Sequence, residues 1–231
     1  MVGPHYTASN RIRYRCIDGG GVVLDLGSQR YSVLDELATS LWSVLTRDGN
    51  DEGDLAQLAA DYGVSRAEIN RSLEAFAAEQ VKAGWLCTPG ASNPPPAPVA
   101  DAGIALRTGS VAALGAIVAT ALSLRVRGFG PTYRALAERR WPAAVERGGV
   151  VAVVGRPFLA AENGFLFRRG ASDCLVRSLS LYRSLRASGV AATHVIGVRR
   201  IPFAAHAWVE VDGQGVLAPA PQGFARLATM M

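Results

Sequence analysis

The chain has 231 residues, of which 49% are hydrophobic and 19% charged, and its formal net charge is +5. This length and apolar content are enough to bury a core, so we expect a globular protein and exclude a disordered one. The three cysteines, Cys16, Cys87 and Cys174, form no close pair and no CxxC motif. This argues against a disulfide framework or a metal site and indicates a cytoplasmic protein, as does the absence of a secretory pattern at the N-terminus.

The first predicted elements are three short strands, which extended apolar patterns place at residues 11–16, 22–26 and 29–34. A glycine triplet, residues 19–21, is expected to turn the chain between the first two. From Asp35 the apolar residues recur at helical spacing and predict two helices, the second of which ends at Gly63.

A third helix begins with Ser65-Arg-Ala-Glu68, the spacing of a capping box, and runs to about Lys82. Residues 1–87 therefore predict a winged-helix-like domain of three strands and three helices, the last two in a helix-turn-helix arrangement. A DNA-binding regulator is a competing interpretation of such a shape. The first 90 residues hold 8 Lys and Arg against 12 Asp and Glu, which is poor for phosphate contacts, so we expect no nucleic acid partner.

A boundary follows at residues 88–103, which are rich in proline, alanine and glycine and predict a semi-rigid linker. The second domain, residues 104–231, begins with helical sequence to about residue 148. Its stretch 109–124 is uncharged, but it is short and rich in alanine for a membrane span. We favour a helix that is buried or faces a partner, and a transmembrane helix remains the alternative.

The rest of the second domain contains an apolar run at 150–154, a less regular segment up to Gly170 and a helix that ends near Ser188. Three extended segments come after that helix, at residues 192–200, 204–211 and 216–217. Helices followed by an antiparallel sheet predict an α+β fold.

Cys174 lies at the start of the helix that ends near Ser188, with Ser172 suited to the N-cap position. Unpaired backbone N–H groups and the helix dipole stabilise negative charge there, which favours a nucleophilic thiolate. Asp173 is better placed as a partner of the dipole than as a catalytic acid. A small apolar filler is the competing interpretation of a lone cysteine.

His206 begins a strand in which His206, Trp208 and Glu210 alternate with smaller apolar residues. Because the apolar face belongs to the core, His206 is expected to face a cleft, with Trp208 either lining that cleft or simply packing. A cysteine acyl-transfer enzyme needs a thiol and an imidazole that takes the thiol proton and later protonates the leaving amine. Spacing alone also allows a structural histidine.

The run DCLVRSLSLYRSLRASGV, followed by HVIGVRR and PFAAHAWVEV, closely resembles the leader-peptidase part of lasso peptide B proteins. That part is similar in fold to transglutaminase-like and papain-like cysteine peptidases, and the similarity covers about residues 104–231. Residues 1–87, which close with Gly84-Trp85-Leu86, resemble the leader-recognition element related to the pyrroloquinoline-quinone peptide chaperone. The two parts are separate chains in many lasso pathways and are fused here.

The resemblance implies that Cys174 is the nucleophile and His206 the general base and acid of a leader peptidase. It also implies three partners: the leader of a precursor peptide, an asparagine-synthetase-like cyclase and, as an alternative partner for helix 109–124, an export transporter. No cofactor and no metal are implied. The leader is expected to add as a strand to the edge formed by Gln29, Arg30, Tyr31, Ser32, Val33 and Leu34, although a plain surface strand fits each of these residues as well.

The family's third catalytic residue, an aspartate after the histidine, has no counterpart, because its position holds Ala218 or Pro219. Glu210 shares the face of His206 but lies about 13 Å along the strand, and the only later acid is farther. The side-chain carbonyl of Gln222 can accept a hydrogen bond from the imidazole. Other possibilities stay open: a Cys-His dyad, an orienting backbone carbonyl or an acid from elsewhere in the chain. The site can also be impaired, which would leave a non-catalytic chaperone that binds the precursor.

Overall fold

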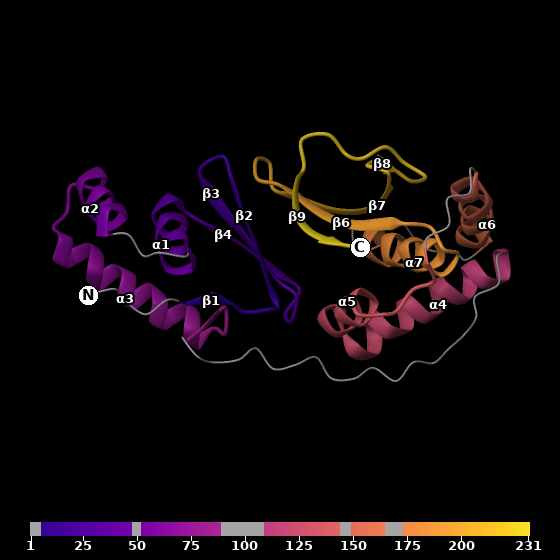
Figure 1. Cartoon of the computed structure of the whole chain (residues 1–231), viewed down its shortest axis with the longest axis horizontal. Helices are drawn as coiled ribbons and strands as arrows, with labels where there is room; N and C mark the ends of the chain where they lie inside the picture. The colour runs from indigo at the N-terminus through magenta and orange to yellow at the C-terminus, as the bar shows by residue number, and fades with distance from the viewer. Residues whose placement is uncertain (1–5, 48–51, 89–108, 144–148, 165–172) are drawn as a thin grey trace. The chain divides into compact units, whose positions relative to one another are not determined.

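The computed structural model describes residues 6–47, 52–88, 109–143, 149–164 and 173–231 (Figure 1). The chain divides into two compact units, Met1–Pro96 and Ala97–Met231. Apart from Thr88, the expected linker lies outside the described residues. Both units combine helices with antiparallel strands, so the predicted α+β class is confirmed.

The first unit contains a three-stranded antiparallel sheet in the order β2-β3-β4, with bounds Ile12–Ile17, Gly20–Asp25 and Arg30–Leu34. These strands lie within one or two residues of the predicted ones. A second ladder was not predicted, because each of its strands, β1 (Thr7–Ala8) and β5 (Leu86–Cys87), has only two residues.

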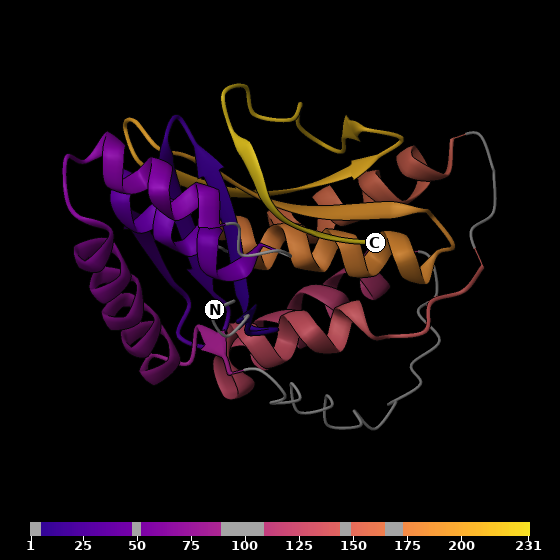
Figure 2. The ribbon, with the colours of Figure 1, turned by 60° about the vertical axis from the view of Figure 1, so that its left-hand side comes forward.

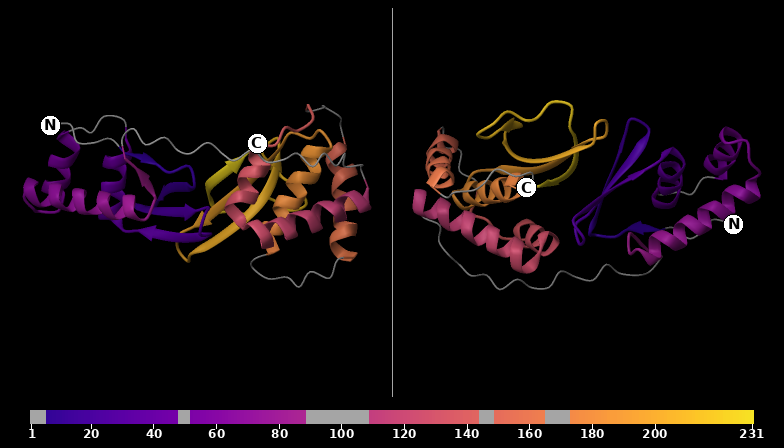
Figure 3. Two further views of the ribbon diagram at one scale, coloured as in Figure 1. Left: turned by 90° about the horizontal axis from the view of Figure 1, so that it is seen from below. Right: turned by 180° about the vertical axis from the view of Figure 1, so that it is seen from behind.

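Helices α1 (Glu36–Thr46) and α3 (Arg66–Lys82) pack against this sheet, and α2 (Glu52–Asp61) packs on α1 and α3, farther from the sheet (Figure 3). Asp35 caps α1, because its carboxylate accepts a hydrogen bond of 2.8 Å from the Ala38 N–H. The predicted capping box of α3 is confirmed, with reciprocal bonds between Ser65 and Glu68.

Trp42 is at the centre of the core of the first unit. Its ring is 1% exposed and lies between those of Tyr14 and Trp85, at centroid distances of 5.3 and 6.3 Å. The glycine triplet is not all turn, because residues 20 and 21 belong to β3. A Cβ on Gly21 would stand 2.7 Å from the Tyr14 ring, so this glycine makes room for the aromatic core.

The second unit contains four described helices: α4 (Ser110–Arg127), α5 (Phe129–Ala137), α6 (Val150–Gly164) and α7 (Asp173–Ala187). Residues 150–164 are therefore helical, whereas the sequence predicted a less regular segment beyond the apolar run. A proline within this stretch, Pro157, made the helical pattern hard to recognise.

A four-stranded antiparallel sheet completes the second unit in the order β8-β7-β6-β9. Its strands are β6 (Ala192–Arg199), β7 (Ala204–Val211), β8 (Gln214–Gly215) and β9 (Ala225–Met230). Figure 2 shows α7 packed beneath the sheet, with α4 and α5 beneath α7. The sequence did not predict β9, which pairs with β6 on the side opposite to β7.

Helix α4 is, by length and composition, the one described helix apolar enough to cross a membrane. One face of it packs inside the second unit through Ala113, Ala116, Ile117 and Thr120. The opposite face exposes Val111, Val118, Leu122 and Val126. The helix is therefore partly a core element, with an apolar stripe left on its outer side.

Candidate functional site

Cys174 is half-buried in the first turn of α7, which begins at Asp173. The suggested N-cap, Ser172, lies outside the described residues. Ser178 follows Cys174 by four residues and therefore lies one turn further along the same side of the helix. The thiol thus occupies the start of a helix, where the helix dipole stabilises negative charge.

His206 is exposed and lies opposite Gly197 in the pairing of β7 with β6. Its ring is stacked on that of Trp208, with a centroid distance of 6.3 Å and an interplanar angle of 17°. The ring of Phe224 meets it edge-on, also at 6.3 Å. The imidazole is therefore bordered by two aromatic rings.

Glu210 is engaged away from the imidazole. Its buried carboxylate accepts a hydrogen bond of 2.7 Å from the Trp208 indole N–H and forms an ion pair of 2.8 Å with Arg226. The side chain of Glu210 is 3% exposed and that of Arg226 is 53% exposed. Glu210 therefore supports Trp208 and does not contact His206 directly.

The two candidate catalytic side chains approach the sheet from different sides. Helix α7 packs on the face that bears His194, since Ser178 hydrogen-bonds His194 and the Tyr182 ring contacts it. Paired residues share a face, so His206 lies with Gly197, three residues from His194, on the other face. The described contacts of the imidazole are with aromatic rings and not with the thiol.

The first half of β7, which carries His206, lies at an edge of the sheet. β8 pairs only with Glu210 and Val211, so within the described residues the first half of β7 is open on that side. Catalytic hydrogen bonds are often long in the free enzyme and shorten only in the complex with substrate. The thiol thus lies at the start of α7, and the imidazole lies on the face of the sheet opposite to α7.

The segment at the family's acid position folds back over β8. Leu217 has a left-handed backbone with φ of 64° and packs against Gly155 of α6. The backbone of residues 218–220 then lies against Gly215, which pairs with Glu210. Ala218 and Pro219 are exposed there, and Gln222 is exposed in the turn two residues before Phe224.

His194 is a buried polar residue that sequence reasoning did not single out. It is fully buried, its Nε2 lies 2.9 Å from the Ser178 hydroxyl, and burial lowers its pKa to about 3. The edges of two tyrosine rings, Tyr133 and Tyr182, meet its imidazole. The signal that predicts this is the alternation in THVIGV, which puts His194 on the core face with Ile196.

The expected leader-binding segment lies at an edge of the first sheet, where β4 pairs on one side with β3. Gln29 precedes this strand with a φ of 61°, and Arg30 is exposed. Val33 is 53% exposed, whereas Leu34 belongs to the core. Tyr31 and Ser32 are half-buried.

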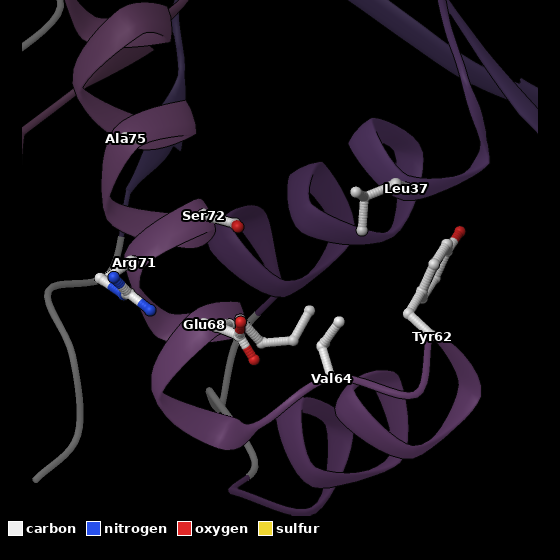
Figure 4. Close-up of a pocket in the computed structure, with 8 residues that line it drawn as sticks. Leu37, Tyr62, Val64, Glu68, Arg71, Ser72 and Ala75 are labelled. Carbon is white, nitrogen blue, oxygen red and sulfur yellow. The ribbon is translucent and has the colours of Figure 1, made fainter.

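A groove of about 500 Å³ lies just beyond the end of β4, between the start of α1 and the side of α3 (Figure 4). Leu37, Tyr62 and Val64 line one side of it, and residues of α3 line the other. Tyr62 and Val64 are 43% and 39% exposed. Within the described residues, the first unit therefore has a strand, β4, that pairs on one side only, and a separate groove between α1 and α3.

Comparison with known proteins finds a family match for each unit. The transglutaminase-like superfamily matches residues 116–231, half of the chain. The chain belongs to the transglutaminase-like superfamily. Coenzyme PQQ synthesis protein D (PqqD) matches residues 20–86, which run from β3 through the three helices of the first unit to the start of β5.

Two individual proteins are also similar to this transglutaminase-like chain. The microcin J25-processing protein McjB of Escherichia coli is 52% identical over 50 residues, which are 22% of this chain and 24% of McjB. The chain thus spans about a quarter of that relative's length. The solved structure of TbiB1 in complex with the TbiA(beta) leader peptide is 26% identical, covers 37% of this chain and 98% of that one, and has a TM-score of 0.32.

The PqqD match, the transglutaminase-like match and the segment shared with McjB together bear out the predicted resemblance to lasso peptide B proteins. The winged-helix-like and transglutaminase-like parts of the predicted fold are confirmed as well.

Proposed function

We propose that this protein binds the leader of a ribosomally made lasso precursor on its first unit and cleaves that leader with its second. The observation that carries the proposal is that one chain joins a PqqD-like unit with an open strand edge to a transglutaminase-like unit with a thiol at a helix start. The core peptide is then handed to an asparagine-synthetase-like cyclase.

In the proposed reaction His206 takes the proton of Cys174, and the thiolate attacks the carbonyl carbon of the scissile peptide bond. The imidazolium then protonates the leaving amine as the C–N bond breaks, which leaves an acyl-enzyme. Water, deprotonated by His206, attacks the thioester, and the proton returns to the thiolate. The products are the leader carboxylate and the free amine of the core.

The cleavage half is tested by mass spectrometry of a precursor incubated with the cyclase and either wild-type protein or the Cys174→Ala variant. We expect cleavage by wild type and none by Cys174→Ala. Cys16→Ala is the matched control, since Cys16 is an exposed thiol of the first unit. Cleavage by Cys174→Ala would refute the assigned nucleophile.

The binding half is tested with proline substitutions along β4. Successive N–H groups of an edge strand point alternately to the neighbouring strand and outward. Ser32→Pro and Val33→Pro each remove one N–H, and only one of the two N–H groups points outward. The variant that loses the outward N–H should keep its melting temperature but lose binding to a fluorescent leader peptide. The variant that loses the N–H directed at β3 should have a lower melting temperature. Leader binding that survives both changes would exclude strand addition at β4.

A second function is favoured by one observation, that the imidazole contacts aromatic rings and not the thiol. In this alternative the protein binds the precursor and delivers it without cutting it. Intact precursor after incubation with wild type and cyclase, together with retained leader binding, would support this alternative.

A further inference from the structure

The aromatic stack beside His206 is held by the buried carboxylate of Glu210, which is paired with the half-exposed Arg226. Trp208 donates its indole N–H to Glu210, and Arg226 Nη2 lies 2.8 Å and 3.1 Å from the two carboxylate oxygens. We propose that Trp208, held by Glu210 and Arg226, is a positioning residue that orients the imidazole of His206 in place of the missing aspartate. This inference rests on the proposed peptidase function.

The indole has little freedom to move. Trp208 is 9% exposed, and its ring covers Gly197, where an added Cβ would stand only 2.5 Å from the indole Cη2. A hydrogen bond to a buried, charged acceptor is stronger than one between neutral groups. Arg226 balances the negative charge of Glu210. The indole is therefore held at its N–H end by Glu210, and its six-membered ring packs over Gly197.

This fixed indole restricts the imidazole. The two rings are within 17° of parallel, and the Phe224 ring closes a second side at 63°. The guanidinium of Arg199 lies over the Phe224 ring, at 5.3 Å from its centroid, and adds a contact to that ring. Aromatic pairs at such distances prefer offset stacking, and the face of an indole attracts a cation such as the imidazolium formed in the reaction.

Glu210 acts only through the tryptophan. It lies four residues from His206, about 13 Å along an extended strand. A triad aspartate orients its histidine and stabilises the imidazolium by a direct hydrogen bond. Here the same two effects come from the face and the fixed plane of an aromatic ring.

The test uses the full chain with cyclase and precursor, and compares wild type with Trp208→Phe and Trp208→Leu. Loss of the stack should lower kcat about tenfold in Trp208→Leu with little change in KM. Trp208→Phe keeps an aromatic face and should lose only about threefold. Trp141→Leu is the control, since it removes another tryptophan of the second unit that contacts Tyr182 and Arg139 and not His206.

Orientation is read separately by NMR of protein labelled with ¹³C-histidine, in which the His206 signal is identified by its loss in His206→Gln. The ring signal should shift and broaden in Trp208→Leu, less in Trp208→Phe and not in Trp141→Leu. This measurement does not require cleavage. If wild type is inactive, the proposed peptidase function is refuted, but the NMR result still tests whether Trp208 orients the His206 ring.

Three outcomes would overturn the inference. The first is an unchanged His206 signal in Trp208→Leu, which would show that the indole does not orient the ring. The second is an equal loss of kcat in Trp208→Leu and Trp141→Leu, which would indicate a structural role. The third is a rise in kcat in Trp208→Leu, which would mean that the stack holds the imidazole away from the thiol.

Discussion

Gly197 lies beneath the Trp208 ring, and its substitution by alanine tests the packing on which the site depends. The added Cβ would stand 2.5 Å from Cη2 and 2.6 Å from Cζ3 of the indole, and 3.3 Å from the Ala225 carbonyl oxygen. The indole cannot simply tilt away, because its N–H is bonded to the buried carboxylate of Glu210.

Overpacking of this kind costs about 1–3 kcal/mol in free energy of unfolding. For a chain of this size about 1 kcal/mol corresponds to about 2–4 °C, so Gly197→Ala should lower the melting temperature by about 2–12 °C. The measurement is thermal unfolding followed by circular dichroism, with leader cleavage measured at a temperature at which both proteins are folded. Cleavage should also fall, since the indole that moves is the one stacked on His206.

Gly115→Ala is the matched control. No atom lies within 4 Å of the place where its Cβ would stand, and the residue is in α4. Alanine in a helix interior is favoured over glycine by up to about 1 kcal/mol, so this variant should melt at or above the wild-type temperature. Equal melting temperatures for Gly197→Ala and wild type would show that Trp208 does not cover Gly197, and the reasoning about the stack would fail with it.

Two further predictions concern stability. Burial lowers the pKa of His194 to about 3, whereas the pKa in the unfolded chain is about 6.5. Between these two values only the unfolded state binds the proton. The free energy of unfolding therefore falls as the pH is lowered from about 6.5 to about 3. In urea unfolding at pH 7.5 and 5.5, wild type should lose about 1.4 kcal/mol more than His194→Gln, and equal losses would contradict a neutral, buried imidazole. Ser65→Ala removes the capping box of α3 and should cost about 1 kcal/mol in urea unfolding, whereas the exposed Ser72→Ala, in the same helix, should cost less. Equal stability of these two serine variants would mean that the cap contributes nothing.

The sequence predicted those elements whose signals are local. The strands of the first sheet, the helix start at Asp35 and the capping box at Ser65 were all found, because alternation and capping chemistry act within a few residues. The position of Cys174 in the first turn of α7 follows from the same kind of signal. The resemblance to lasso peptide B proteins came from motif order, which is also carried by the sequence.

Features that depend on distant packing were not predicted. Gly21 was assigned to a turn, because nothing local shows that the Tyr14 ring needs its space. Strand β9 was missed, since pairing with β6 and not its own pattern makes it a strand. The engagement of Glu210 with Trp208 and Arg226 requires two strands that come together only in the folded sheet.

The path of the chain after Val216 determines whether an acid at residue 218 could reach His206. Leu217 turns the chain with a φ of 64°, and the backbone of residues 218–220 returns over Gly215, opposite Glu210. His206 lies four residues from Glu210 along β7, about 13 Å away in an extended strand. A carboxylate restored at residue 218 would therefore stand too far from the imidazole to accept its hydrogen bond.

Ala218→Asp should accordingly leave kcat for leader cleavage within about twofold of wild type, although removal of a triad aspartate in a serine peptidase costs about 10⁴. Gln214→Asp, which adds the same charge at an exposed position of β8, is the control for a change in net charge. A gain of tenfold or more in Ala218→Asp alone would mean that the segment rearranges to bring residue 218 beside His206. In that case the wild-type site is impaired for want of a carboxylate, and the indole of Trp208 does not replace it.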